Sequence, residues 1–279
     1  MRNRTDLALE KQEEFFKDDG IEKKVRKMKG VEIIKIKIKT NSAAKKLKKP
    51  IGDYITLQKK DILDLENKKV VENILTKEIL KFVEKKNKIL FVGLGNKEIT
   101  PDKLGPEVSS KIIATRHING VLKEILGQED LKSVSVLAPG VLAQTGIETT
   151  EIVKACFKNV KPDLIVAVDA LAARDFKRLG STIQLTNTGI CPGSGVENKR
   201  KELSHKVFGV PVLAIGIPTV VDLKGKDFLK TTDKTQEQMM VTPKNIDLLV
   251  KRGSKLIANS LNKAFFSKLT QEEMEAFFS

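Results

Sequence analysis

The sequence has few of the residues on which several common catalytic sites depend. Among its 279 residues there are two cysteines, two histidines, one tyrosine and no tryptophan. Cys156 and Cys191 lie far apart and outside any CxxC or CxxH pattern, which fits a reducing cytoplasm rather than a disulfide scaffold. His117 and His205 stand in no recognisable nucleophile context and no GxSxG motif occurs, so neither a Ser/His/Asp hydrolase nor a closed zinc site is expected.

Long apolar stretches are also missing. No run of about 18 apolar residues occurs, so no membrane-spanning helix and no membrane partner are expected. Residues 1–16 are polar and charged and lack the apolar centre of a signal peptide. Together with the cysteine usage, this predicts a cytoplasmic protein.

The formal net charge of +15 invites a nucleic-acid interpretation. However, the lysines are spread over almost the whole chain, and only residues 22–49 form a clearly basic zone. With one tyrosine and no tryptophan, base stacking would depend on phenylalanine. Nucleic acid is therefore not the expected partner, although a basic nucleic-acid-binding protein is kept as an alternative.

Helical and strand patterns alternate from about residue 68 onward, beginning with helical spacing of apolar residues over 70–83. Strands are predicted at 89–94, 133–138, 164–168, 181–186 and 211–217. Helices are predicted at about 105–126, at 148–158, from Thr242-Pro243, and from a Thr270 capping box. Apolar strands interleaved with amphipathic helices predict an α/β fold, with a mostly parallel twisted sheet covered by helices on both faces.

The N-terminal part follows another pattern. Residues 6–29 are mostly charged and predict a helix or an arm, whereas residues 31–39 alternate isoleucine with lysine as a half-buried strand does. Residues 48–58 begin with a turn and continue as a second candidate strand. A small strand-containing subregion at about 30–60 is therefore expected beside a single α/β domain.

Two acidic residues are each set into a run of small residues, in a predicted turn that follows a buried apolar strand. Asp102 comes after 89–94, and Asp169 directly follows 164–168. Because ligands of open α/β sheets bind outside the carboxyl ends of the strands, both carboxylates could meet there and activate a water molecule. The sequence therefore favours a hydrolase.

Structural alternatives exist for both residues. Asp102 could cap the next helix, and Asp169 could cap a helix or pair with Arg174 or Arg178. The GxGN fragment at Gly93 and Gly95 does not complete a dinucleotide-binding fingerprint, so no nucleotide cofactor is expected.

The segment 186–200 predicts a long irregular loop of the kind that lines a site. Its candidate oxyanion-binding residues are Gly189, Gly193, Ser194 and Gly195. The GxxxxGK[ST] pattern of a phosphate-binding loop is absent. Cys191 in this loop is a weaker candidate nucleophile, because its sequence neighbours include no obvious base.

Eight segments in colinear order carry a more specific signal. They are RTDLALE (4–10), PIGDYITL (50–57), FVGLGNKEITPDKLGP (91–106), TRH (115–117), APGVLAQTGIET (138–149), AVDALAARD (167–175), TIQLTNTGICPGSGVENKRKEL (182–203) and IGIPTVVD (215–222). Together they resemble the germination proteases of endospore-forming bacteria, endopeptidases that degrade small acid-soluble spore proteins. Glu197 departs from this pattern, because a glycine is expected there.

The resemblance implies an atypical aspartic-type endopeptidase on a fold like that of the hydrogenase-maturation proteases. Asp102 and Asp169 then correspond to the catalytic pair, and no cofactor or metal is expected. The resemblance also implies a homotetramer of the forespore and spore core, made as a zymogen that trims its own N-terminus. A metal-dependent peptidase that uses the same acids is the alternative enzyme.

The N-terminal residues Thr5 to Glu10 are similar to the acid–apolar–Ala–x–Glu pattern that the family cuts in its substrates. This predicts self-cleavage between Asp6 and Leu7. Residues 1–6 would then be the propeptide, and residues 7–279 the protease domain.

Overall fold

The computed structural model describes residues 5–13, 19–118, 131–191, 202–224, 238–269 and 273. Its strands are β1 (Ile21–Met28), β2 (Val31–Ile38), β3 (Gly52–Gln58), β4 (Lys88–Gly93), β5 (Ser133–Leu137), β6 (Leu164–Ala173), β7 (Thr182–Thr186), β8 (Val212–Lys224) and β9 (Gln238–Val241). Its helices are α1 (Ala8–Gln12), α2 (Asn41–Leu47), α3 (Leu65–Val83), η1 (Thr100–Asp102), α4 (Leu104–Ser109), α6 (Leu142–Thr145), α7 (Thr149–Val160), η2 (Phe176–Arg178), α8 (His205–Phe208) and α9 (Ile246–Phe265).

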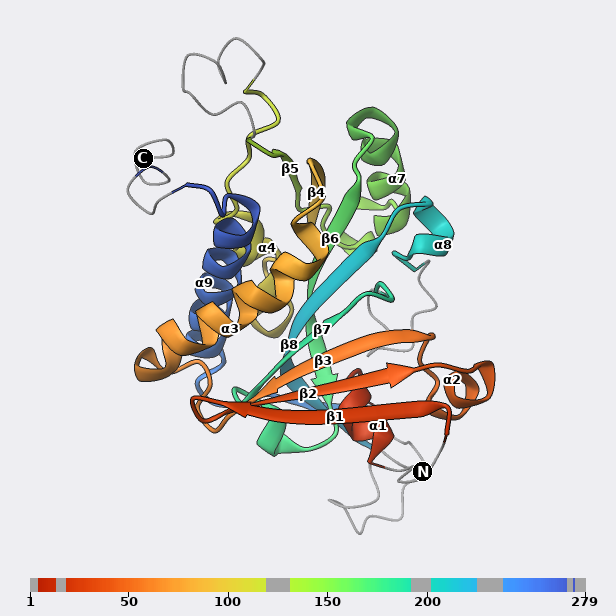
Figure 1. The fold of residues 1–279 in the computed structure, drawn as a ribbon, viewed down its shortest axis with the longest axis vertical. Coiled ribbons are helices and arrows are strands. Elements are labelled where there is room, and N and C mark those ends of the chain that lie inside the picture. The colour runs from red at the N-terminus through yellow and green to blue at the C-terminus, as the bar shows by residue number, and fades with distance from the viewer. Residues whose placement is uncertain are drawn as a thin grey trace.

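The described strands form one sheet in the order β1-β2-β3-β7-β8-β6-β4-β5, with β9 paired to β8 (Figure 1). Strands β5, β4, β6 and β8 run parallel. Helices α3, α4 and α9 cover one face of this parallel part, and α7 and α8 lie on the other (Figure 1). The predicted α/β fold with helices on both faces is confirmed.

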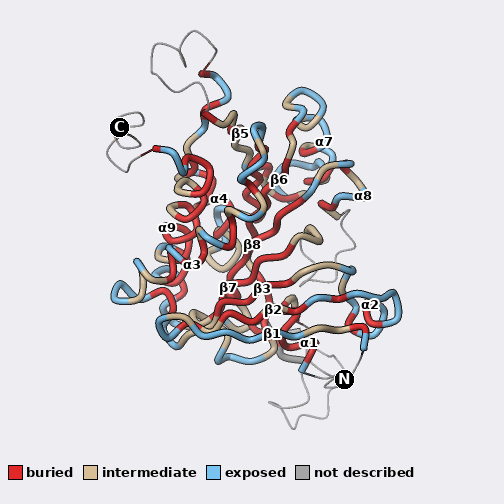
Figure 2. The backbone as a smooth tube through the Cα atoms, in the orientation of Figure 1, coloured by how far each residue is buried: buried red, intermediate tan, exposed pale blue. Residues whose placement is uncertain are grey.

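The alternation of side chains along the central strands explains the two layers. On β4, Ile89 and Phe91 pack toward α3, α4 and α9, whereas Leu90 and Val92 pack toward α7 and α8. Because both faces are covered, each residue of the strand can be apolar. Figure 2 accordingly shows the central strands as buried over most of their length.

The remaining strands make the sheet mixed, where a mostly parallel sheet was predicted. β7 runs antiparallel to β8, and β3, β2 and β1 continue the sheet in antiparallel order. Strands β2 and β3 lie in the region 30–60, where a small β subregion was predicted, and they are continuous with the main sheet through the pairing of Ile55 with Leu185. Helices α1 and α2 pack on this part through an apolar cluster that includes Leu9, Ile36 and Leu47.

The prediction of a helix or arm over 6–29 was wrong for residues 21–28. They form β1, which pairs with β2 along its whole length. The reason is the turn at Lys29-Gly30, where both residues have positive φ (49° and 80°), as two-residue hairpin turns require. β1 is an edge strand with mostly exposed side chains, so it shows little of the apolar alternation from which strands are predicted.

Two predicted helix boundaries were also wrong. Helix α4 ends at Ser109 instead of near residue 126, with residues 119–130 outside the described part. Helix α9 begins at Ile246 with Asn245 as its N-cap residue, not at Thr242-Pro243. The predicted helix from Thr270 lies outside the described residues except for Glu273.

Candidate active site

A cavity of about 520 Å³ lies where β4 ends and β6 continues beyond it. Residues from the segment after β4, from β6 and β7, and from the N-terminus line it together. Among them are Asp102, Asp169 and Gly189, three of the predicted site residues, and Asp6 of the predicted processing site. The fold therefore brings both candidate catalytic carboxylates to one cavity.

Asp102 is held by the turn that follows β4. Its Oδ2 atom accepts a hydrogen bond from the backbone N–H of Asn96 at 2.8 Å. Gly95 has a φ of 119°, and a Cβ atom there would lie 1.9 Å from the carbonyl oxygen of Asp102, so only glycine fits. The N-cap residue of α4 is Lys103, without a side-chain cap. Asp102 is thus not the helix cap of the alternative interpretation.

Asp169 lies within a strand. The sequence predicts that the strand stops at 168, but β6 continues to Ala173 because it pairs with β8, where Asp169 lies opposite Gly216. Asp169 is 6% exposed, and its Oδ1 atom accepts a hydrogen bond from the N–H of Ala170 at 2.9 Å. The structure therefore corrects the position of Asp169 from a turn to an extended strand.

Gly105 allows the two acidic segments to approach. A Cβ atom on Gly105 would lie 2.2 Å from the carbonyl oxygen of Leu94 and 2.6 Å from that of Val168. The N–H of Leu94 also donates to the carbonyl oxygen of Val168 at 2.8 Å. The start of α4 is therefore pressed against the end of β4 and the middle of β6, at the residue that precedes Asp169.

The predicted oxyanion loop is described only in part. Gly189 lines the cavity with a φ of 82°, and a Cβ atom there would lie 2.0 Å from the carbonyl oxygen of Leu203. Gly193, Ser194 and Gly195 lie outside the described residues. Cys191 also lines the cavity, and burial, together with the nearby Glu202, raises the pKa of its thiol. A raised pKa disfavours the thiolate that a cysteine nucleophile requires.

The N-terminal segment enters the same cavity beside β6. The N–H of Asp6 donates to the carbonyl oxygen of Ala172 at 2.8 Å, and the N–H of Ala172 donates to the Asp6 carboxylate at 2.9 Å. Leu7 is fully buried in an apolar cluster with Leu171, Ala173 and Val221. The acidic side chain and the apolar side chain of the predicted processing site thus occupy separate, well-defined positions.

Glu10 fixes the far end of this segment. Glu10 is 2% exposed, and its carboxylate accepts hydrogen bonds from the N–H groups of Arg174, at 2.8 Å, and Asp175, at 3.0 Å. Arg178, one of the two alternative ion-pair partners predicted for Asp169, lies beside Glu10 and Glu13, with its nearest nitrogens at 3.8 and 2.8 Å.

Two residues that sequence reasoning missed contact the carbonyl oxygen of Asp6. Lys49 Nζ donates to it at 2.8 Å, and Gln184 Nε2 donates at 3.2 Å. Gln184 is the largest polar residue in the alternating segment TIQLT of β7, and this size could have singled it out. Lys49 is one of many lysines in the chain, so no sequence signal distinguishes it.

Within the described ranges, no group of three or more His, Cys, Asp or Glu side chains is placed to hold a metal ion. In the same part of the chain, no helix is both long enough and apolar enough to span a bilayer.

Comparison with known proteins shows that the chain is a protease, because the family model that matches residues 2–227 describes a peptidase family. That model is described as "Germination protease". The chain belongs to the germination protease family. It is 39% identical to the germination protease of Caldanaerobacter subterraneus subsp. tengcongensis, covering 97% of this chain and 96% of that one. It is 36% identical to that of Clostridium acetobutylicum, with 98% of each chain covered.

A Bacillus cereus germination protease is 40% identical, over 97% of this chain and 76% of that protein. Among solved structures, the chain is similar to a [NiFe] hydrogenase maturation protease, HycI, from Thermococcus kodakarensis KOD1, with 20% identity and a TM-score of 0.38 over 66% of this chain and 98% of that one. The latter similarity is weak, and the fold rests on the strand order described above.

Proposed function

We propose that this chain is an atypical aspartic-type endopeptidase that cleaves small acid-soluble spore proteins after an acidic residue in the germinating spore. We further propose that it is made as a zymogen, that residues 1–6 are its propeptide, and that it cleaves itself between Asp6 and Leu7. The observation that carries the proposal is that Asp102, Asp169 and Asp6 line one cavity. The candidate catalytic pair and the candidate bond are thus together.

The proposed reaction is hydrolysis of a peptide bond by a pair of carboxyl groups that share one proton. Two close carboxylates resist losing both protons, so the titration belongs to the pair. The ionised group takes a proton from water while the water oxygen bonds to the Asp6 carbonyl carbon. The protonated group then gives its proton to the Leu7 nitrogen as the C–N bond breaks. A carboxyl group on Asp6 and an amine on Leu7 are the products.

The N-terminal segment supports this assignment as a docked substrate sequence. Its acidic residue is bonded to β6 through main chain and side chain, its apolar residue is buried, and its glutamate is bonded by two N–H groups. Because the segment is already seated in its own chain's cavity, self-cleavage is expected to be intramolecular, with a first-order rate constant independent of protein concentration.

The variants Asp102→Asn and Asp169→Asn test the carboxylate pair. Each removes one ionisable group at nearly constant shape, and general acid–base catalysis contributes on the order of 100- to 10,000-fold. We expect the intact mass of the wild-type protein to fall over time by the mass of residues 1–6, with or without a chelator. The mass of either variant should not change. The protein is incubated under mildly acidic, partly dehydrated conditions, and intact mass is measured.

Asp61→Asn is the matched control, because Asp61 is exposed and its positive φ of 51° suits asparagine. It should cleave at the wild-type rate. A near-normal rate for either cavity variant would remove that residue from the mechanism. Inhibition by chelator with rescue by a divalent ion would favour the metal-dependent alternative.

The family resemblance further leads us to propose that the active assembly is a homotetramer. Sedimentation equilibrium should then give about four times the 31.0 kDa chain mass, and a monomer that remains active would contradict the assembly.

A further inference from the structure

We propose that Lys49 and Gln184 are catalytic residues that form the oxyanion-binding pair, stabilising the negative charge that develops on the carbonyl oxygen of the residue before the cleaved bond. The two side chains come from separate elements and meet at one atom. Lys49 Nζ lies 2.8 Å from the carbonyl oxygen of Asp6, and Gln184 Nε2 lies 3.2 Å from it. This inference rests on the proposed cleavage after Asp6.

The amide of Gln184 can be oriented in only one way. Its Oε1 atom lies 2.7 Å from the backbone nitrogen of Ala8, which can only donate a hydrogen bond. The amide nitrogen must therefore face the Asp6 oxygen. Gln184 thus binds the main chain on both sides of Leu7. It would make the same two hydrogen bonds to the main chain of any substrate.

The position of Lys49 is fixed by the end of α2. Lys48 adopts the left-handed conformation (φ 51°, ψ 42°) just after this helix, and the N–H of Lys49 donates to the carbonyl oxygen of Ala44 at 3.1 Å. This arrangement is typical of helix C-caps and orders the chain that follows the helix. The Lys49 side chain therefore extends from an anchored backbone, and the residue is half-buried and lines the cavity.

The chemistry favours these two donors for a developing oxyanion. When water adds to a carbonyl carbon, the oxygen changes from neutral to negatively charged, and donors already aimed at it stabilise the transition state more than the ground state. A positively charged donor forms a stronger hydrogen bond to an anion than a neutral amide does. Lys49 is therefore expected to contribute the larger share and Gln184 to fix the orientation.

The test measures self-cleavage of the full chain by intact mass, comparing Lys49→Met with wild type. Removing one oxyanion donor typically lowers the rate about 100- to 1,000-fold, and that decrease is expected here. Lys49→Arg should recover part of the rate, because it restores a cationic donor. Gln184→Glu keeps the acceptor for the Ala8 N–H but replaces the donor to the Asp6 oxygen by an acceptor, so it should slow cleavage at least as much.

Lys45→Met is the matched control, because it removes the same charge from an exposed position on α2. It should cleave at the wild-type rate. Docking of the segment is measured separately, by hydrogen exchange of the Leu7 and Ala8 amides in an Asp169→Asn background that remains uncut. A slower rate with unchanged protection supports the oxyanion role.

Two results would overturn the inference: an unchanged rate in Lys49→Met, or a slower rate fully matched by lost protection, which would mean that Lys49 only docks the segment. Failure of the proposed function looks different. In that case wild-type protein would not lose residues 1–6, or Asp169→Asn would lose them equally fast, and both proposals would be withdrawn.

Discussion

Two carboxylates of the N-terminal segment are bound by main-chain N–H groups in β6 and in the residues that directly follow it. Asp6 accepts from Ala172, and Glu10 accepts from Arg174 and Asp175. Hydrogen bonds to an ionised acceptor are worth about 1.5–3 kcal/mol each, more than those between neutral groups. Substitutions other than proline leave these main-chain donors in place, so the recognition of an acidic residue at these two places is built into the backbone of the site.

Glu10→Gln should loosen the docked segment while leaving the fold intact. The neutral amide weakens both bonds from Arg174 and Asp175, and a loss of about 1.5–3 kcal/mol corresponds to roughly 10- to 100-fold faster exchange of the segment's amides. Hydrogen exchange of Leu7 and Leu9, measured in the uncut Asp169→Asn background, checks this expectation.

Glu13→Gln provides the comparison, because the Glu13 side chain, which pairs with Arg178, is 43% exposed. Ion pairs whose carboxylate is open to solvent contribute about 0–1 kcal/mol, so exchange should rise by less than about fivefold. Equal effects of the two variants would show that the buried position of Glu10 has no special importance.

At the scale of elements, the decisive feature is the close approach of α4 to the end of β4 and the middle of β6. Gly105 permits it, since a Cβ atom would meet the carbonyl oxygens of Leu94 and Val168 at 2.2 and 2.6 Å. Both obstacles are backbone atoms that cannot rotate away. Because Gly105 has no side chain, the segment 100–105, which carries Asp102, can lie directly against β6.

Gly105→Ala should both destabilise the protein and slow cleavage. Forcing an extra methyl group into a well-packed site costs about 1–3 kcal/mol, and the segment that carries Asp102 must shift to accept it. Chemical denaturation gives the free energy of unfolding, and intact-mass kinetics give the rate.

The comparison variant is Gly209→Ala, at a position of positive φ (73°) after α8 with open space around it. It should cost about 1–2 kcal/mol for backbone conformation alone and leave the cleavage rate unchanged. A Gly105→Ala protein that cleaves as fast as wild type would mean that the contact does not position the acidic pair.

A second element-scale feature is an irregularity in the pairing of β6 with β8, where Thr219 of β8 has no partner in the register. The register shifts between Leu171 and Ala172 of β6, next to the backbone atoms that bond Asp6. Bulges of this kind occur beside active sites because they redirect a strand locally. Here the shift lies at the residue to which the N-terminal segment is bonded.

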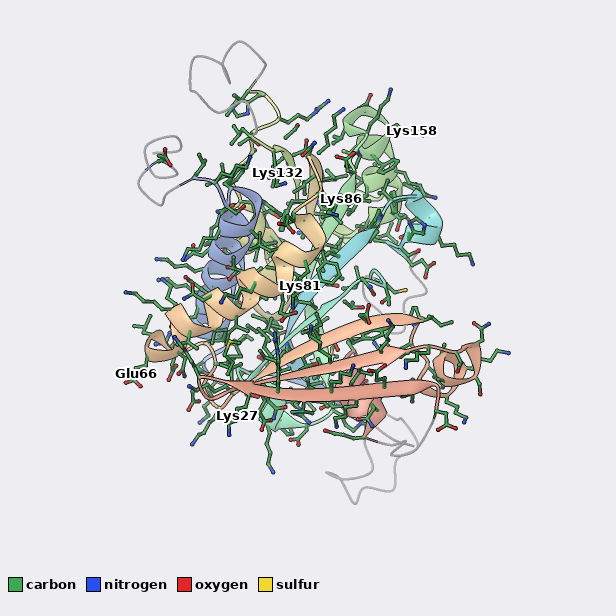
Figure 3. All side chains as sticks on the ribbon, in the orientation of Figure 1. Lys27, Glu66, Lys81, Lys86, Lys132 and Lys158 are labelled. Atoms are coloured by element: carbon green, nitrogen blue, oxygen red, sulfur yellow. The ribbon has the colours of Figure 1, made fainter. Side chains whose placement is uncertain are left out.

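At the scale of the whole molecule, the positive charge is distributed widely. Figure 3 labels Lys27 on β1, Lys81 on α3, Lys86 after it, Lys132 before β5 and Lys158 on α7. These lysines belong to different parts of the fold, so the net charge of +15 is not that of a single patch. A field of this kind would attract an acidic substrate from solution without specifying its sequence.

Cleavage of a separate glutamate-rich peptide by the self-processed protein should therefore fall as salt rises. Charges more than a Debye length apart, about 8 Å at physiological ionic strength, are largely screened. We expect kcat/KM to decrease several-fold between low and physiological salt, and self-cleavage to change much less because the segment is already docked.

A peptide with its flanking glutamates replaced by glutamine, and the acidic residue at the cleaved bond retained, serves as the control and should respond weakly to salt. Identical salt responses of the two peptides would mean that the basic charge does not guide substrate association.

The sequence by itself determined the α/β class, most strands and both acidic residues of the candidate site. These are local signals. An apolar run of five or six residues predicts a strand covered on both faces, and an acidic residue at the end of such a run indicates a candidate site. The strand ends were less certain, since β6 continues past residue 168 only because β8 is there to pair with it.

Only the tertiary structure decided what surrounds the carbonyl oxygen of Asp6. Lys49 and Gln184 are 43 and 178 residues away from Asp6 in the chain, and no local pattern links residues at such separations. They meet because β3 pairs with β7 and the N-terminal segment lies beside β6. The order of strands in the sheet thus determines which side chains can act on one bond. That order arises from pairing between strands that are far apart in the sequence. Short-range periodicity does not encode such pairing.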